Sequence, residues 1–275
     1  MSRQVLSAEQ VDEFHQRGVL KFDFGFDQQL LDQIVEALDP LYESSYRDNP
    51  LVPTRVQDAW KKVDQVRRLA VDQRVLTALE QLVGRKPLPF QTLNFPVGTS
   101  QFAHSDTIHF STMPEGYMAG VWVGLEDIDL DNGALIYYPG SHKLPYYSMQ
   151  DLGLSQGYEH YHEYEQCIQR IISEKELQPE YGQIKKGEAI IWHANLLHGG
   201  SPFKDTSRTR HSQVTHYYFE GCKYYTPMES RPGKPRFRDP LWIPEGEDFV
   251  LPAEGYELPL AARAARKLRR MFRLG

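Results

Sequence analysis

The sequence predicts a mainly β protein with flanking helices, built as a sandwich or a barrel. Helical periodicity dominates the first part of the chain, and from residue 88 onward apolar residues approach strict alternation in short segments separated by turns. Aromatic residues make up 12% of the chain, which is typical of a β-rich core or an aromatic-lined cleft. The strands do not alternate with helices as in βαβ units, and no glycine-rich nucleotide loop is present, so nucleotide cofactors are disfavoured.

Three helices and one short strand are expected in the N-terminal part. Ser7 opens a capping-box pattern, and Gly18 marks the end of the helix that follows it. Gly84 ends the third helix in the same way. Apolar residues at helical spacing define the other helices, and a β-branched and aromatic run defines the strand. The expected segments are a helix after Ser7, a strand over 19–22, and helices over 27–38 and 74–83.

Five later segments are rich in β-branched and aromatic residues and are expected to be strands. They cover 88–97, 118–125, 135–138, 188–192 and 213–219. The Asn132-Gly133 pair is a turn signal between two of them. A polar, Tyr- and Glu-rich stretch over 156–177 is expected to be helical, and the Pro- and Gly-rich segment over 225–259 to be irregular.

Composition excludes several classes of protein. The 275 residues contain no apolar run of about 18 residues, so no membrane-spanning helix is expected. Only two cysteines occur, Cys167 and Cys222, which excludes a disulfide scaffold and a cysteine-rich zinc site. A start without a secretory signal and a low cysteine content favour a cytoplasmic location.

Charge is distributed unevenly along the chain. The net charge is −6, but residues 260–275 carry +6, which leaves −12 on the remaining 259 residues. Such an acidic body repels nucleic acid, so no nucleic-acid partner is expected. The C-terminal segment has the pattern of a basic amphipathic helix, which predicts peripheral membrane or protein contact. The same pattern also suits a terminal helix that packs on the acidic body.

One short motif and one distant histidine suggest a metal site. On a strand, His104 and Asp106 would present an imidazole and a carboxylate on the same face. His198 follows a predicted strand and precedes two glycines that let the backbone approach closely, whereas His193, five residues earlier, would face the opposite way. Two histidines and one carboxylate on one face of an octahedral ion form the facial triad of non-haem Fe(II) oxygenases, which leaves three positions open.

An arginine downstream offers a partner for a cosubstrate. Arg208 and Arg210 stand at the start of the last predicted strand, and Arg210 lies 12 residues after His198. A guanidinium group there suits the far carboxylate of a dicarboxylic cosubstrate. Pattern alone leaves the choice between these two arginines open, although Arg210 is nearer the strand.

Taken together, these segments resemble the phytanoyl-CoA dioxygenase family of Fe(II)/2-oxoglutarate oxygenases. The matching pieces lie between residues 6 and 219 and read LSAEQVDEFHQRGVL, QFAHSD, MAGVWVGLEDIDLDNGALIYYPGSHK and LLHGGSPFKDTSRTRHSQVTHYY. The resemblance implies a double-stranded β-helix (jelly-roll, cupin-like) core. It implies Fe(II), 2-oxoglutarate and O2 as cofactor and cosubstrates.

The resemblance also assigns roles to residues. His104, Asp106 and His198 match the iron ligands, and Arg210 matches the arginine that pairs with 2-oxoglutarate. Trp122 and Gln101 fall at positions that line the 2-oxoglutarate pocket. Substrate contacts are expected from His109 and from Tyr161 in the tyrosine-rich stretch. Family halogenases lack the carboxylate ligand, so the presence of Asp106 favours hydroxylation.

The sequence therefore predicts a dioxygenase that hydroxylates an aliphatic C–H bond of a small metabolite, lipid or saccharide-type substrate and converts 2-oxoglutarate to succinate. Residues 1–259 are expected to form a single domain, with a basic tail over 260–275. Within that domain we expect a helical part over 1–86, a jelly-roll core over 87–222 and an irregular wrap over 223–259. Two other classes stay open: a non-catalytic cupin-like metal-binding or sensing module, and an adaptor that acts through the tail.

Overall fold

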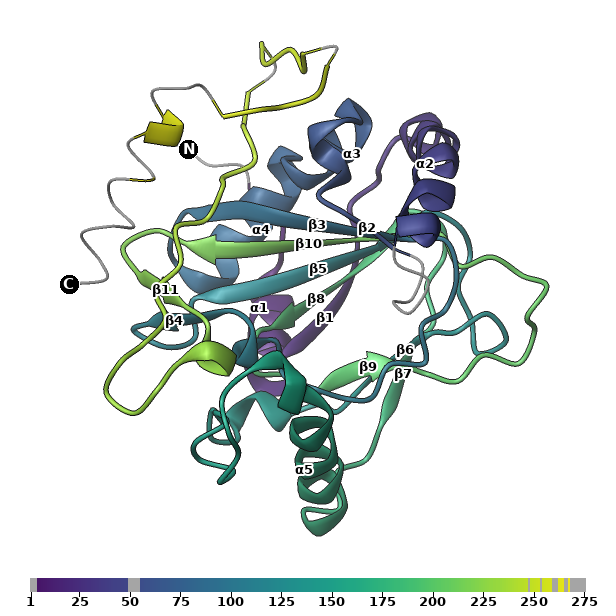
Figure 1. Ribbon diagram of the computed structural model, residues 1–275. Coiled ribbons are helices and arrows are strands. Elements are labelled where there is room, and N and C mark those ends of the chain that lie inside the picture. The colour runs from purple at the N-terminus through teal and green to yellow at the C-terminus, as the bar shows by residue number, and fades with distance from the viewer. Residues whose placement is uncertain are drawn as a thin grey trace.

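The computed structural model describes residues 4–48, 55–246, 248–252, 254–258, 262–264 and 267. Two antiparallel sheets form a jelly roll with flanking helices, as predicted (Figure 1). The large sheet has six strands, in the order β1 (Val19–Asp23), β8 (Glu188–His193), β5 (Met118–Gly124), β10 (Ser212–Phe219), β3 (Pro87–Phe95) and β2 (Val56–Gln57). The small sheet has three, in the order β7 (Glu180–Gly182), β6 (Leu135–Tyr137) and β9 (His198–Gly200). A separate pair joins β11 (Lys223–Tyr225) to β4 (Ser111–Met113).

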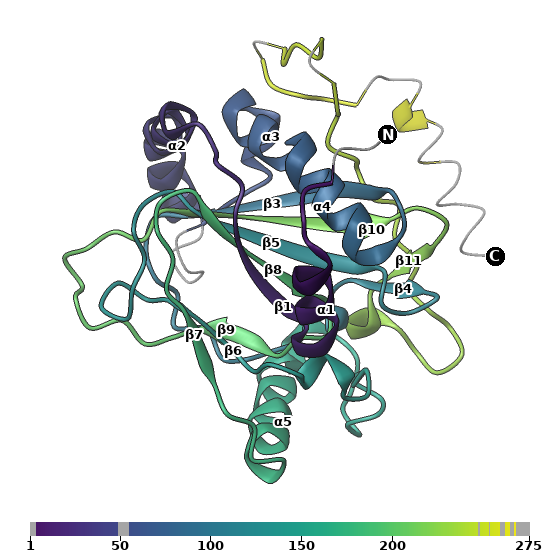
Figure 2. The ribbon, with the colours of Figure 1, turned by 180° about the vertical axis from the view of Figure 1, so that it is seen from behind.

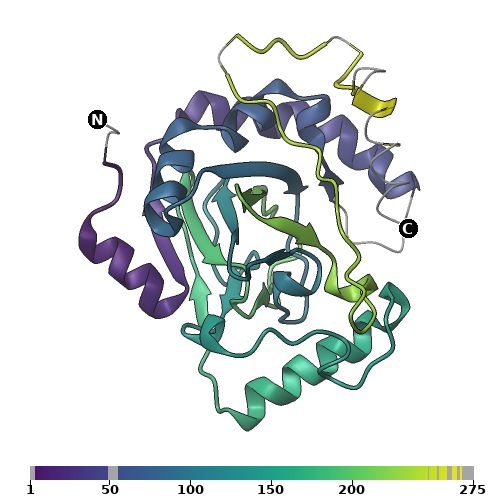
Figure 3. The same cartoon turned by 90° about the vertical axis from the view of Figure 1, so that its left-hand side faces the viewer.

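Helices cover the outer face of the large sheet, and one further helix lies beside the small sheet. The first group is α1 (Ala8–Arg17), α2 (Gln28–Asp48), α3 (Asp64–Ala70) and α4 (Gln73–Val83), with α1 next to β1 (Figure 2). The helix on the other side is α5 (Tyr161–Glu174). Seen from the side, α2, α3 and α4 form a layer above the curved large sheet, α1 lies beside the sheet, and α5 lies at the opposite end of the molecule (Figure 3).

Alternation along the central strands separates two apolar layers. On β10, Tyr217 and Phe219 pack with the helices, whereas Val214 belongs to the cluster between the two sheets. On β8, Ile191 faces the helices and Trp192 faces the space between the sheets. All eight residues of β10 are buried, so the strand is covered on both faces. The inner face of this sheet is the surface that carries the candidate site.

Gly120 on β5 makes room for one of the side chains of the inner layer. A Cβ atom at this position would lie 2.3 Å from the Trp192 ring, well inside the van der Waals limit. The two residues are paired across β5 and β8, so the indole lies against the glycine backbone. The absence of a side chain at Gly120 therefore fixes where Trp192 points.

The predicted helix ends are partly confirmed. Ser7 caps α1 with a complete capping box, and Gly18 and Gly84 end α1 and α4 in the left-handed conformation. The second helix was expected to end at residue 38, but α2 continues to Asp48 through Pro40. The apolar stripe also continues, since Tyr42 is buried in the same cluster as Leu38, and this packing outweighs the lost backbone hydrogen bond.

The sequence correctly predicted strands in all five later segments, but it missed α3 and the short strands β2, β4, β7, β9 and β11. Asn132-Gly133 lies in a turn that connects the two sheets, with Gly133 at φ 97°, so it is not a hairpin between paired strands. Within the described part of the chain, no helix combines the length and the apolar character needed to cross a membrane. Most of the predicted basic tail, residues 260–275, lies outside the described residues.

Candidate metal centre and cavity

A short antiparallel bridge brings two distant histidines together. The backbone N–H of His104 donates to the carbonyl of His198 at 2.9 Å, and the reverse bond measures 3.0 Å. The ring centroids then lie 4.7 Å apart. Gly199 allows this approach, since a Cβ atom there would lie 2.5 Å from the carbonyl oxygen of Gln101. The backbone thus makes the close approach that was expected at the glycines after His198.

Asp106 reaches the same point by a different local structure from the one expected. The segment was predicted to be a strand, but only His104 takes part in a β-bridge, and Asp106 opens a 3-10 turn over Asp106–Ile108. Ser105 caps this turn, because its hydroxyl accepts the N–H of Thr107 at 3.2 Å. The strand prediction was therefore wrong for Asp106, although its carboxylate still points at both histidines.

The donor atoms of these three side chains fit a single metal ion. The ligand atoms of His104, Asp106 and His198 all lie within 4.8 Å of one another, and all three residues are buried. The carboxylate oxygens are 3.7 Å from Nε2 of His104 and 3.8 Å from Nε2 of His198. These separations exceed hydrogen-bond length and suit atoms that share one ion.

Hydrogen bonds on the far side of each ring orient the histidines. Nδ1 of His104 lies 3.1 Å from the carbonyl oxygen of Phe102, and Nδ1 of His198 lies 2.9 Å from that of Leu196. A neutral imidazole that donates Nδ1–H to a carbonyl exposes the lone pair of Nε2. In that form both Nε2 atoms direct a lone pair toward the carboxylate, which is the arrangement that a metal ion requires.

Two further side chains hold Asp106, and sequence reasoning did not identify them as part of the site. The indole N–H of Trp192 donates to Oδ2 at 2.8 Å. Nε2 of His216 lies 3.6 Å from the same oxygen, and its Nδ1 lies 3.0 Å from Oε1 of Gln91. His216 sits two residues after Val214 on the inward face of β10, so strand alternation was the available signal.

The protonation states of Asp106 and His198 favour metal binding. Burial opposes a charge on Asp106, but a positive charge on His198 and the contacts with His104 and His216 hold the pKa of its carboxyl well below the usual range. Burial lowers the pKa of His198 to about 4, so this ring is neutral near pH 7. For His104, burial also disfavours the charged form, but the contact with Asp106 and its negative charge outweigh burial and raise the pKa. A metal ion would therefore displace a proton from His104.

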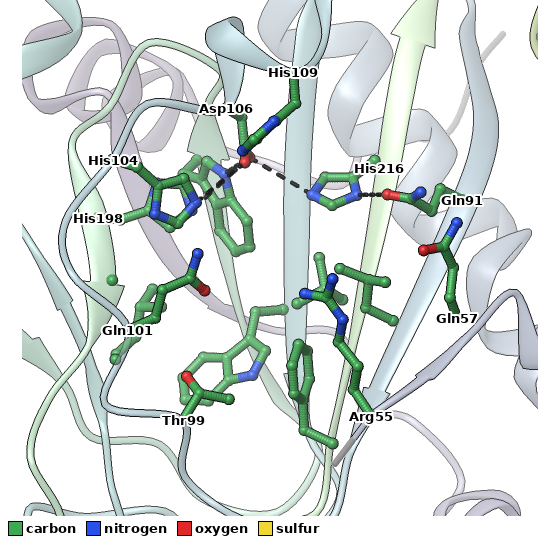
Figure 4. A pocket seen from close by; sticks show the side chains of 18 of the residues that line it. Arg55, Gln57, Gln91, Thr99, Gln101, His104, Asp106, His109, His198 and His216 are labelled. Atoms are coloured by element: carbon green, nitrogen blue, oxygen red, sulfur yellow. Dashed lines mark hydrogen bonds and ion pairs between the residues drawn. The ribbon is translucent and has the colours of Figure 1, made fainter. Parts of the chain in front are cut away.

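The three candidate ligands line a cavity of about 420 Å³. Figure 4 shows His104, His198 and Gln101 on one side, with His216, Gln91, Gln57 and Arg55 on the other. Aromatic and aliphatic side chains cover much of the rest of the wall. These are Leu93, Phe95, Phe110, Trp122, Leu135, Trp192 and Val214.

The two candidate arginines occupy different places. Arg210 lines the cavity with only 5% of its surface exposed, and its guanidinium carbon lies 5.6 Å from the Trp122 ring. Burial lowers its pKa to about 10, which leaves it positively charged at neutral pH. Arg208 lies outside the cavity wall and binds both carboxylate oxygens of Asp129 at 3.0 Å. The structure thus gives Arg208 a partner elsewhere and aims Arg210 at the cavity.

Of the other predicted site residues, some line the cavity and one does not. Trp122, Gln101 and His109 all line the cavity. Tyr161 does not reach its wall, and its ring packs behind that of His109 with centroids 5.0 Å apart. Tyr158 lines the cavity instead, stacked on His109 at 5.7 Å. Spacing on a helix did not reveal this difference, because Tyr158 precedes α5 on its own 3-10 turn.

His193 lies away from the metal centre, as expected. It ends β8 on the side of His142, with ring centroids 5.5 Å apart, and its Nδ1 accepts the backbone N–H of Asn195. Ser141 in the preceding turn accepts the N–H of Leu197 at 2.9 Å. The turn after β6 therefore supports the backbone that carries His198.

Comparison with known proteins places these features in a family. The family model described as phytanoyl-CoA dioxygenase matches residues 2–212. The peroxisomal phytanoyl-CoA dioxygenase of Rattus norvegicus is 24% identical over 193 residues, which cover 66% of this chain and 54% of the relative. A probable phytanoyl-CoA dioxygenase of Caenorhabditis elegans is 28% identical over 126 residues, or 44% of this chain and 37% of the relative. The aligned region spans about half the length of the curated phytanoyl-CoA dioxygenases of rat, cow and human.

Solved structures share the fold. EctD from S. alaskensis with bound Fe has a TM-score of 0.65 at 20% identity, covering 84% of each chain. The epimerase SnoN in complex with Fe3+, alpha ketoglutarate and nogalamycin RO has a TM-score of 0.61 at 19% identity, covering 87% of this chain and 95% of that one. At this level of identity the likeness establishes the jelly-roll architecture with its flanking helices.

Proposed function

This chain belongs to the phytanoyl-CoA dioxygenase family, and from that membership we propose that it is an Fe(II)- and 2-oxoglutarate-dependent dioxygenase. The proposed reaction hydroxylates an aliphatic C–H bond of a small-molecule substrate and converts 2-oxoglutarate to succinate and CO2. One observation carries the proposal: His104, Asp106 and His198 converge at a cavity that Arg210 also lines. A metal site and a carboxylate anchor in one cavity are what this chemistry needs.

His104, Asp106 and His198 would hold the iron, which would supply the oxidising chemistry once O2 binds. Two neutral imidazoles and one carboxylate occupy three positions and leave the others open toward the cavity. A closed structural zinc site would use four protein ligands, usually with cysteine. Among the described residues, only these three side chains form such a cluster, and neither cysteine belongs to it.

Arg210 would bind the far carboxylate of 2-oxoglutarate. Its guanidinium group is buried, cationic and bordered by Phe95 and Trp122, with ring centroids 5.5 and 5.6 Å from its central carbon. Ser212 and the carbonyl of Val97 each accept one hydrogen bond from it at 3.2 Å, which fixes its direction. A buried cation needs a counter-ion, and a carboxylate matches its planar donors. Trp122 and Gln101 would shape the same subsite.

Succinate formation from 2-oxoglutarate tests the proposal without knowledge of the substrate. The purified chain, supplied with Fe(II) and O2, should release succinate slowly through uncoupled turnover. The Asp106→Ala variant should lose this activity, and His193→Gln, which changes a histidine outside the centre, should keep it. A wild-type chain that binds iron but neither binds nor converts 2-oxoglutarate would instead be a metal-binding or sensing module.

A further inference from the structure

Asn195 lies in the turn between β8 and β9, three residues before the candidate ligand His198. Only 3% of its surface is exposed, so its side-chain amide has to find hydrogen-bond partners within the protein. It finds them on two segments that are far apart in the sequence. One segment carries His104 and Asp106, and the other is the turn that follows β6.

The amide nitrogen of Asn195 faces the turn after β6. Nδ2 donates to the carbonyl of Leu144 at 2.8 Å and to the carbonyl of His142 at 3.1 Å. The hydroxyl of Ser141 in the same turn accepts the backbone N–H of Leu197 at 2.9 Å. This turn therefore holds the chain at two points immediately before the third candidate ligand.

The amide oxygen of Asn195 faces the segment that carries the other two candidate ligands. Oδ1 lies 3.1 Å from the hydroxyl of Ser105 and 3.3 Å from the hydroxyl of Thr107. Both residues are buried, and they flank Asp106 in the sequence. Their hydroxyls lie 2.6 Å apart, and that of Ser105 also lies 3.1 Å from the carbonyl oxygen of Ala194. These contacts connect the 3-10 turn of Asp106 to the turn of Asn195.

The partners of the amide determine its orientation. A carbonyl oxygen can only accept, so the amide nitrogen has to face His142 and Leu144, and the amide oxygen then accepts from the hydroxyls. The Asn195→Asp substitution would keep the acceptor but place a second carboxylate oxygen against both carbonyls. The position therefore needs a side chain with donors on one side and an acceptor on the other.

We propose that Asn195 is a positioning residue of the metal centre, which holds the segment of His104 and Asp106 against the segment of His198. This inference rests on the proposed function, because it takes these three side chains as the iron ligands. The backbone bridge between residues 104 and 198 brings the two histidines together, and Asn195 fixes the turn that carries the carboxylate. Loss of its amide would remove a hydrogen-bond partner from buried polar groups on both segments.

Calorimetry with Co(II) in variants of the full chain tests the proposal. Asn195→Ala removes both connections, and Asn195→Asp removes the donors only. Each should bind Co(II) at least about tenfold more weakly than the wild type, because the ligands are no longer held in one arrangement. Affinities within about twofold of the wild type in both variants would overturn the proposal.

Thr107 gives a second pair of variants, which decides the question if the Asn195 variants fail to fold. Thr107→Val removes the hydroxyl from a side chain of nearly the same shape and should weaken Co(II) binding about threefold or more. Thr107→Ser keeps the hydroxyl and should bind Co(II) within about twofold of the wild type. Equal affinities in Thr107→Val and Thr107→Ser would contradict the connection.

Asn132→Ala is the matched control for metal affinity. Asn132 is also buried, and its Nδ2 donates to the carbonyls of Asp127 at 3.1 Å and Thr209 at 2.9 Å. Its Oδ1 accepts the backbone N–H of Asp129 at 2.8 Å. These loops carry none of the three candidate ligands, so this variant should lose stability in thermal unfolding but keep its Co(II) affinity within about twofold. An equal loss of affinity in Asn132→Ala and Asn195→Ala would overturn the proposal.

The visible absorption spectrum of the Co(II)-loaded chain depends on the arrangement of the ligands and not on the stability of the fold. The spectrum should change in Asn195→Ala and stay the same in Asn132→Ala, and an unchanged spectrum in Asn195→Ala would refute the positioning role alone. A wild-type chain whose Co(II) affinity does not depend on Asp106, measured with Asp106→Ala, would refute the metal centre and the role of Asn195 together.

Discussion

Asp106 is the residue on which the candidate metal centre depends most. Its two oxygens face His104 and His198, and Trp192 donates to Oδ2 at 2.8 Å, which fixes the carboxylate in one rotamer. Such contacts behind a ligand commonly change metal affinity by about 10- to 100-fold when they are removed. The motif of His104 and Asp106 can therefore present its carboxylate to a metal ion because Trp192 from β8 orients that carboxylate.

Substitution of Arg210 and substitution of Arg208 should have different effects on the KM for 2-oxoglutarate. Arg210→Gln should raise the KM for 2-oxoglutarate about tenfold or more in the succinate assay, because it removes a buried charge that faces the cavity. Arg208→Gln should leave that KM within about twofold, since Arg208 binds Asp129 outside the cavity. A larger effect at Arg208 would reverse the assignment of the anchor.

The lowered pKa of His193 should make the free energy of unfolding depend on pH in the acid range. Burial, with positive His142 and His15 nearby, lowers its pKa to about 4 from the ordinary value of 6.5. Between pH 6.5 and 4 the unfolded chain binds a proton at this site that the folded chain refuses, so the free energy of unfolding falls as pH falls. By pH 4 this one group should cost about 3 kcal/mol.

Urea unfolding of the metal-free chain at pH 7 and pH 4.5 measures this effect. His193→Gln should lose less stability between the two values than the wild type does, since the other buried histidines contribute equally to both chains. Equal losses in the two proteins would show that His193 accepts its proton without penalty.

At the scale of elements, the bridge between residue 104 and residue 198 depends on Gly199. A Cβ atom there would meet the Gln101 oxygen at 2.5 Å and the Ala103 nitrogen at 3.0 Å, both of them backbone atoms that cannot rotate away. Gly199→Ala should therefore cost about 2 kcal/mol or more and weaken iron binding, because the two histidines would separate.

Thermal unfolding and bound iron per chain measure both consequences. Gly233→Ala is the control: its φ of 66°, unlike the backbone of Gly199, disfavours alanine, but a Cβ atom would meet nothing within 4 Å. That variant should lose about 1 kcal/mol and bind iron normally. Iron binding by Gly199→Ala equal to that of the control would contradict the role of the close approach.

Elements with a local signal were predictable from the sequence, and those fixed by distant contacts were not. Ser7, Gly18 and Gly84 act within their own helices, so capping rules predicted both ends of α1 and the end of α4. The length of α2 depends on what covers Tyr42, which no local rule contains. The strand predicted for Asp106 failed because Ser105 caps a 3-10 turn within three residues of His104.

The candidate site likewise contains residues that a sequence motif predicts and residues that only distant contacts bring into the cavity. Its ligands and Arg210 were predicted from a motif order, because family patterns preserve chemistry-bearing residues. Arg55, Arg238 and His216 were not, because their presence in the cavity depends on how an edge strand, a C-terminal loop and an inward strand face meet. Tyr161 was expected to contact the substrate, and Tyr158 reaches the cavity wall in its place.

At the scale of the whole molecule, the described residues of the cavity wall all precede the basic segment over 260–275 in the sequence. A chain shortened after Pro259 should keep uncoupled succinate formation within about twofold, since each described residue of the cavity wall precedes residue 239. If the segment binds a membrane surface, the shortened chain should lose sedimentation with anionic vesicles at low salt. Loss of succinate formation on truncation would show instead that the segment supports the catalytic body.

The central claim is that three side chains share one ion at the inner face of the large sheet. Anaerobic equilibrium dialysis against Fe(II), with iron counted per chain, tests it most directly in the wild type and in His104→Ala, Asp106→Ala and His198→Ala. We predict one tightly bound ion in the wild type and a loss of at least about tenfold in affinity in each variant. Unchanged affinity in the three variants would contradict the assignment of the metal centre.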